Sequence, residues 1–184
     1  MSPPVLRAAI LRIAGPLFAA HGPDGVSMRR IAQACGVHLP SIYHAFENKQ
    51  TLYEACCEAA QHRGSQAIAA AMEAAGAHEG DRLDAFARAV CAAFEADLEL
   101  RAFLLQDEWR QVAWIAGSTP LAALFDNVVP IAARVLRLPS AETRHALRVF
   151  GALSLARGMA ANGGMSLPEP AALWAMAFAS NRAD

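Results

Sequence analysis

Two short segments, residues 28–35 and 38–45, have helical spacing of apolar residues and are joined through Gly36. A glycine at this place allows the left-handed backbone conformation that ends one helix and begins a tight turn. Ala32, four residues before the glycine, is small enough for the two helices to approach closely. The apolar residues expected to hold the second helix against the first are Ile31, Cys35, Val37, Ile42 and Phe46. This spacing predicts a helix-turn-helix.

The remaining sequence also favours helices. Hydrophobic residues make up 55% of the chain, alanine is abundant and β-branched residues are few, a composition that favours helix because alanine loses no side-chain entropy there. No segment alternates apolar and polar residues as a half-buried strand does. After a first helix that begins near Pro3, we expect helices over residues 28–35, 38–45, 49–72, 81–96, 98–115, 120–136, 141–161 and 169–180. The predicted fold class is therefore all-α.

Two domains are predicted within this fold. Residues 1–48 form a three-helix domain that contains the helix-turn-helix, and residues 49–184 form a larger helical domain. Asn48 is the expected cap of the helix over residues 49–72, which links the two. Residues 1–65 carry a formal charge of +2 and the remainder −3, so the amino-terminal part is better suited to approach a polyanion.

The cysteines indicate a reducing compartment, because their spacing is not that of a disulfide framework. They are Cys35, Cys56, Cys57 and Cys91. Arg7 and Arg12 interrupt the apolar amino terminus, which is therefore not expected to act as a signal peptide. We expect a cytoplasmic protein without a membrane partner.

The segment "SMRRIAQACGVHLPSIYHAFENKQTLYEA", residues 27–55, resembles the DNA-binding domain of the TetR family of bacterial transcriptional repressors. The residues that match the family are Ile31, Ala32, Gly36, Val37, Ile42, Tyr43, Phe46, Lys49 and Leu52. The resemblance covers about the first third of the chain. It implies an amino-terminal DNA-binding domain followed by a helical domain that binds a ligand and dimerises.

This resemblance implies that the second helix of the motif lies in the major groove of a double-stranded DNA operator. Base contacts are then expected from His38, Leu39, Ser41 and His44. Phosphate contacts are expected from Ser27, Arg29, Tyr43 and Lys49, and the resemblance points to the last two most directly. The reading helix contains neither Arg nor Lys, so it lacks the bidentate contact that Arg makes with guanine.

The last two predicted helices suggest self-association. The helix over residues 169–180 has no charge after Glu169, and a helix that is apolar on most sides needs a covering surface on most sides. The family resemblance implies that the last two helices pair with their copies in a homodimer. Burial within one subunit is the alternative.

Aromatic and charged residues in the middle helices suggest a site for a small-molecule inducer, apolar or amphipathic. The candidates for contact with it are Phe103, Trp109, Trp114 and Arg157. Ordinary core packing and surface ion pairs are the alternatives for these residues. The helix over residues 49–72 would transmit ligand binding to the operator-binding domain and release the repressor from a palindromic operator.

The sequence leaves two alternative functions to weigh. A helical enzyme lacks support, because the sequence has no GxSxG, Gly-rich phosphate loop, HExxH or zinc-ligand spacing. We therefore expect no catalytic residue, metal or cofactor. The second is a regulator of the same fold controlled by oxidation of Cys56, Cys57 or Cys35, although most such cysteines are buried and inert.

Overall fold

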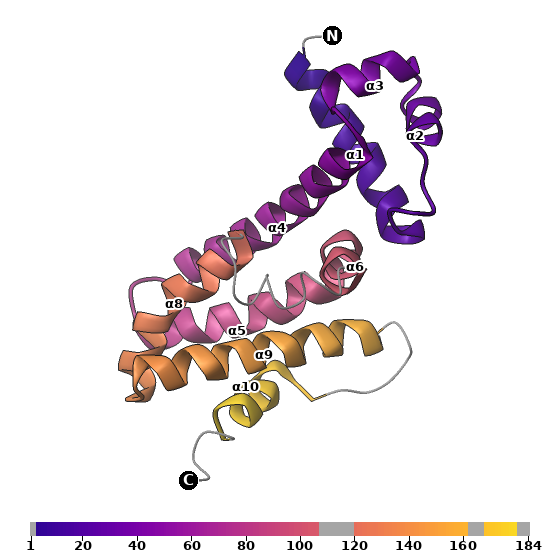
Figure 1. Ribbon diagram of the computed structural model, residues 1–184. Coiled ribbons are helices and arrows are strands. Elements are labelled where there is room, and N and C mark those ends of the chain that lie inside the picture. Colours follow the sequence, from indigo (N-terminus) through magenta and orange to yellow (C-terminus); the bar gives the residue numbers. More distant parts are fainter. Residues whose placement is uncertain (1–2, 107–119, 162–167, 180–184) are drawn as a thin grey trace. The chain divides into compact units, whose positions relative to one another are not determined.

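A computed structural model describes residues 3–106, 120–161 and 168–179 (Figure 1). Every regular element in these ranges is a helix, which confirms the predicted all-α class. The helices are α1 (Pro3–His21), α2 (Met28–Cys35), α3 (Leu39–Ala45), α4 (Lys49–Ala74), α5 (Glu79–Ala96), α6 (Leu98–Gln106), α8 (Pro120–Leu136), α9 (Ser140–Ala161) and α10 (Pro170–Ala179).

The helix ends follow local capping chemistry. Asn48 caps α4, because its Oδ1 accepts the backbone N–H of Thr51 at 2.9 Å. In return, the backbone N–H of Asn48 donates to the Thr51 hydroxyl at 3.2 Å. The helix α4 ends two residues later than expected, at Ala74, and Gly76 adopts a positive φ of 86° in the break that follows. The expected continuation of α6 beyond Gln106 lies outside the described residues.

The chain divides into two compact units, residues 1–60 and residues 61–184. The division falls inside α4, so the beginning of this helix belongs to the first unit. The start of α4 belongs to the first unit because its Leu52 and Tyr53 are buried there, with 0% and 4% exposure. A functional boundary after residue 48 stays a prediction.

The first unit is built from α1, α2, α3 and the start of α4. Helix α1 packs against α2 and α3, which also pack against each other. Phe18 of α1 and Tyr53 of α4 meet edge to face, with ring centroids 5.3 Å apart. The residues that fill this core are Ile10, Ala14, Phe18, Ile31, Ile42 and Leu52. The core thus fixes α3 on the surface of a small helical unit.

Helix α1 is long and apolar enough to cross a membrane by length and composition alone, with a mean hydropathy of 1.2. One such helix is weak evidence for insertion. Arg7 and Arg12 interrupt it, and its buried residues, Ile10, Ala14, Gly15 and Phe18, pack within the first unit. Core packing gives these four residues of the helix a role outside a membrane.

The second unit is organised around α9, which packs against α5, α8 and α10 (Figure 1). An aromatic cluster lies where these helices meet. Phe86 of α5 approaches Phe125 of α8 at 5.1 Å between ring centroids, and Trp174 of α10 lies 4.9 Å from Phe150 of α9 and 4.6 Å from Phe178. These rings form the centre of the second core.

Within the second unit, the later part of α4 is tied to the start of α6 by an ionic contact. Arg63 donates to Asp97 at 3.3 Å and to Glu99 at 3.0 Å. The other oxygen of Asp97 caps α6 by accepting the backbone N–H of Leu100 at 2.9 Å. The neighbouring Gly64 packs so closely that a Cβ there would lie 2.6 Å from a methyl of Leu100. We call these contacts the Arg63 clasp.

Candidate nucleic-acid interface

The turn between α2 and α3 has the geometry that the sequence predicts. Gly36 adopts φ 66° and ψ 29°, the left-handed conformation. Its N–H donates to the carbonyl of Gln33 at 3.1 Å, and the N–H of Val37 donates to the carbonyl of Ala32 at 3.0 Å. These two bonds satisfy carbonyls at the end of α2 and set the direction in which α3 leaves the turn.

The contact between α2 and α3 is apolar. Ile31, Ala32, Ile42 and Phe46 are buried, with 3% exposure at most. Two other residues expected at this contact, Cys35 and Val37, are only half-buried. A well-packed inner face leaves the opposite face of α3 in solvent.

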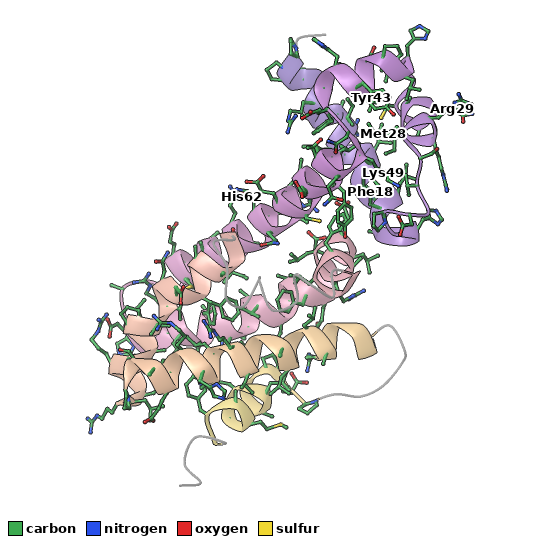
Figure 2. All side chains as sticks on the ribbon, in the orientation of Figure 1. Phe18, Met28, Arg29, Tyr43, Lys49 and His62 are labelled. Atoms are coloured by element: carbon green, nitrogen blue, oxygen red, sulfur yellow. The ribbon has the colours of Figure 1, made fainter. Side chains whose placement is uncertain are left out.

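The start of α2 is capped as expected. Ser27 has an extended backbone, and its hydroxyl oxygen accepts the backbone N–H of Arg30 at 3.1 Å. Because the oxygen is the acceptor in that bond, the hydroxyl hydrogen is free to donate to an anion. Arg29 is exposed and points away from α2 into solvent (Figure 2).

The predicted contact residues divide by exposure. Ser27, Arg29, His38, Tyr43 and His44 are exposed, whereas Leu39, Ser41 and Lys49 are half-buried. Tyr43 leaves 48% of its surface in solvent. All eight lie in the first unit, on or beside α2, α3 and the start of α4.

Pro40 is a surface residue of α3 that is not among the predicted contact residues. It is exposed, and it precedes the exposed His44 by four residues on the same helix, a spacing that places both on one face. Leu39, one of the expected base contacts, is half-buried. A helical wheel centred on Ile42 places Pro40 on the opposite, outward side of the helix. The exposure of Pro40 was therefore predictable from sequence.

Arg7 of α1 is the other residue that sequence reasoning missed. Its guanidinium donates to the carbonyl of Ala45 at 2.8 Å and lies 4.0 Å above the ring of Phe46. No local sequence signal points to this contact, because the donor and acceptor residues are 38 positions apart. Arg7 therefore joins α1 to the carboxyl end of α3.

The thiols are poorly suited to oxidation sensing. Burial raises the pKa of the Cys35 thiol, which lowers the fraction of reactive thiolate at neutral pH. Cys56 and Cys57 are 2% and 7% exposed. These observations give no support to the alternative of control by cysteine oxidation.

Two of the four candidate ligand residues, Phe103 and Arg157, lie within the described residues. Phe103 of α6 is buried at 4% exposure. Arg157 of α9 pairs with Glu95 of α5 and donates to the carbonyl of Pro168. Trp109 and Trp114 lie outside the described residues. Ligand contact by these residues stays a prediction.

Two grooves open on the second unit. One lies between α8 and α9, and Phe125, Asp126, Arg144 and Leu147 are among its lining residues. The other, of about 340 Å³, lies between α5 and α10 and includes Trp174. Sequence reasoning did not select Trp174, because nothing local to α10 shows that it meets Phe86 and Phe150. Among the described residues, no cluster of His, Cys, Asp and Glu could hold a metal ion.

Comparison with known sequences supports the resemblance in the first unit. Residues 10–56 match the model of a family described as bacterial regulatory proteins, tetR family. The Tetracycline repressor protein class C of Escherichia coli is 40% identical over 53 residues, which are 29% of this chain and 24% of that protein. The match therefore spans about a quarter of the length of this curated relative.

Solved structures share the fold over nearly the whole chain. A protein from Mesorhizobium loti ascribed to the TetR family has a TM-score of 0.69 at 20% identity, over 100% of this chain and 96% of that one. The superantigen PfiT has a TM-score of 0.66 at 24% identity, with both chains covered completely. A TetR-family regulator from Streptomyces coelicolor has a TM-score of 0.61 at 24% identity, over 98% and 82%. These likenesses confirm the fold.

Proposed function

We propose that this protein is a DNA-binding transcriptional regulator and not an enzyme. The match of residues 10–56 to the model of the bacterial regulatory proteins, tetR family, supports this proposal. The observation that carries the proposal is the left-handed turn at Gly36, which sets α3 on α2 with a polar, exposed outer face. That is the geometry with which a helix-turn-helix places its second helix in the major groove. The proposed place of action is the cytoplasm.

Two sets of residues are proposed to contact DNA, one at the phosphates and one at the bases. We assign phosphate contacts to four residues at the start of α2, within α3 and at the start of α4, of which two are cations: Ser27, Arg29, Tyr43 and Lys49. We assign base contacts to His38, Leu39, Ser41 and His44 along α3. Because α3 has no Arg or Lys, these base contacts are individually weak, and phosphate contacts supply much of the affinity.

The direct test is a titration of labelled duplexes followed by fluorescence anisotropy at several salt concentrations. The duplexes are a palindrome from the DNA upstream of the gene and a scrambled control. The proposal expects tighter binding to the palindrome and an affinity that falls steeply with salt. If neither duplex is bound even at low ionic strength, the proposal is wrong.

Homodimerisation is proposed through α9 and α10. Helix α10 exposes Ala172, Ala175 and Met176, and Met176 leaves 52% of its surface in solvent. Helix α9 exposes Ala152 and Ala156. Such small and apolar outer faces are suited to cover the same faces of a second copy. A two-fold dimer would present two α3 helices about 34 Å apart, or at a multiple of that distance, to a palindromic operator.

We further propose that a small apolar or amphipathic inducer binds the second unit and releases the operator. Phe103, Trp109, Trp114 and Arg157 are the proposed contacts, and the aromatic cluster and the two grooves support a ligand site in this unit. A ligand that favours the conformer with poorly spaced α3 helices must weaken operator binding by the same factor. Helix α4 is the proposed lever, and the Arg63 clasp joins its later part to α6 within the second unit.

The inducer proposal has its own test. Operator titrations are repeated in the presence of a panel of amphipathic aromatic compounds, with tryptophan fluorescence as an independent measure of compound binding. We expect at least one compound to bind and to weaken operator affinity. If every compound that binds leaves the operator affinity unchanged, the proposed linkage is wrong while DNA binding itself stands.

A further inference from the structure

The carboxyl end of α3 is held by a side chain from outside the helix-turn-helix. Arg7 on α1 donates from its guanidinium to the carbonyl of Ala45, the last residue of α3, at 2.8 Å. The same guanidinium lies 4.0 Å above the ring of Phe46. Phe46 is 2% exposed and ends the helix in an extended conformation.

Each contact has a physical reason. The last carbonyls of a helix have no partner inside the helix and carry partial negative charge, so a cation that donates to one of them is favourable. A planar guanidinium also stacks on an aromatic face while its edge stays available for hydrogen bonds. A lysine has no such plane and could make only the first contact well.

These contacts matter because α3 is short. It has seven residues, its amino-terminal cap His38 makes no side-chain capping bond, and proline follows at its start. The turn at Gly36 orients the amino-terminal end, and the buried Ile42 and Phe46 hold the inner face. Arg7 adds a polar attachment at the carboxyl end, next to His44, and Arg7, His44 and Ala45 line one groove with the start of α1.

We propose that Arg7 is a positioning residue for sequence recognition: by holding Ala45 and Phe46 against α1, it sets the angle at which α3 offers His44 to the bases. This inference rests on the proposed DNA-binding function. It assigns Arg7 no contact with DNA. Loss of Arg7 should therefore reduce discrimination between sequences more than it reduces binding to DNA in general.

The test compares Arg7→Lys and Arg7→Ala with wild type, using the palindrome and the scrambled duplex at several salt concentrations. Arg12→Ala is the matched control, because Arg12 is an exposed arginine on the same helix. We expect Arg7→Ala to lower the ratio of specific to non-specific affinity by about tenfold, a loss comparable with that of one base contact. Arg7→Lys should lower it less, because lysine can keep the bond to Ala45 but not the stacking on Phe46. The salt dependence of binding should stay unchanged, and Arg12→Ala should keep the wild-type ratio.

Two outcomes would overturn the inference. If Arg7→Ala lowers the slope of log affinity against log salt by about one unit and Arg7→Lys restores it, Arg7 is a phosphate contact. If the variants melt at lower temperature but keep the wild-type ratio, Arg7 serves stability alone.

A measurement without DNA separates this inference from the proposed function. Amide hydrogen exchange of the free protein should speed up in residues 42–46 of Arg7→Ala and stay unchanged in α2. Unchanged exchange in residues 42–46 would reject the positioning role even if the protein binds its operator. Faster exchange in a protein that binds no DNA would reject the proposed function instead.

Discussion

Gly36 sets the geometry of the turn through its backbone alone. A Cβ built there meets no heavy atom within 4 Å, so the only obstacle to a side chain is the positive φ of 66°. Gly36→Ala should therefore lower the free energy of unfolding by about 1 kcal/mol, the cost of a left-handed non-glycine residue. Gly36→Asn should cost less, since Asn tolerates this conformation. Urea denaturation checks both, and an alanine variant as stable as wild type would contradict the argument.

Tyr43 and His44 are adjacent and exposed but have different proposed roles. Tyr43→Ala should weaken binding to specific and scrambled duplexes by a similar factor, about fivefold, because a phosphate contact carries no sequence information. Tyr43→Phe isolates the hydroxyl. The measurement is anisotropy with both duplexes, and a change in preference instead of overall affinity would mean that Tyr43 reads bases.

His44→Ala should change the preference among operator variants, with a loss of about tenfold at one base-pair position. A panel of duplexes with single substitutions locates that position. Uniform weakening across the panel would show that His44 contacts the backbone.

At the scale of elements, α4 depends on one side chain for its start. Asn48→Ala removes the acceptor for the Thr51 N–H and should lower the free energy of unfolding by about 1 kcal/mol. Asn48→Asp keeps a capping oxygen and should stay near wild type. Urea denaturation followed by circular dichroism measures both variants, and equal losses in the two would show that the cap is not the cause.

The Arg63 clasp gives the lever proposal a specific test. Arg63→Ala frees α4 from Asp97 and Glu99, so inducer binding should weaken operator affinity less than in wild type, by about twofold or more. Arg134→Ala is the control, because its pairing with Glu79 joins α8 to α5 and does not involve α4. Operator titrations with and without inducer measure the factor by which inducer weakens operator affinity. If this factor is the same in both variants, the contact between α4 and α6 does not transmit inducer binding.

At the scale of the molecule, dimerisation determines whether two α3 helices can bind one operator. Met176→Glu would bury an unpaired carboxylate in the proposed interface and should weaken dimerisation by about two orders of magnitude. The control is Ala123→Glu, which adds the same charge at an exposed position of α8. Analytical ultracentrifugation compares them, and a dimer that survives Met176→Glu would place the interface elsewhere.

Local chemistry along the chain determined the helices and the turn. Ser27 and Gly36 delimit α2, and Asn48 begins α4, because caps and left-handed glycines act within a few residues of the helix end they terminate. The exposed positions of Tyr43 and His44 followed in the same way from helical periodicity around Ile42. The all-α class and the place of the candidate interface were therefore predictable from sequence.

Tertiary packing decided the contacts between distant residues. The bond from Arg7 to Ala45 spans 38 positions, and the pairing of Arg157 with Glu95 spans 62. Trp174 joined the aromatic cluster only because α10 packs against α5 and α9. Periodicity identifies which side of a helix is apolar, but the neighbour that covers it depends on how the whole chain packs.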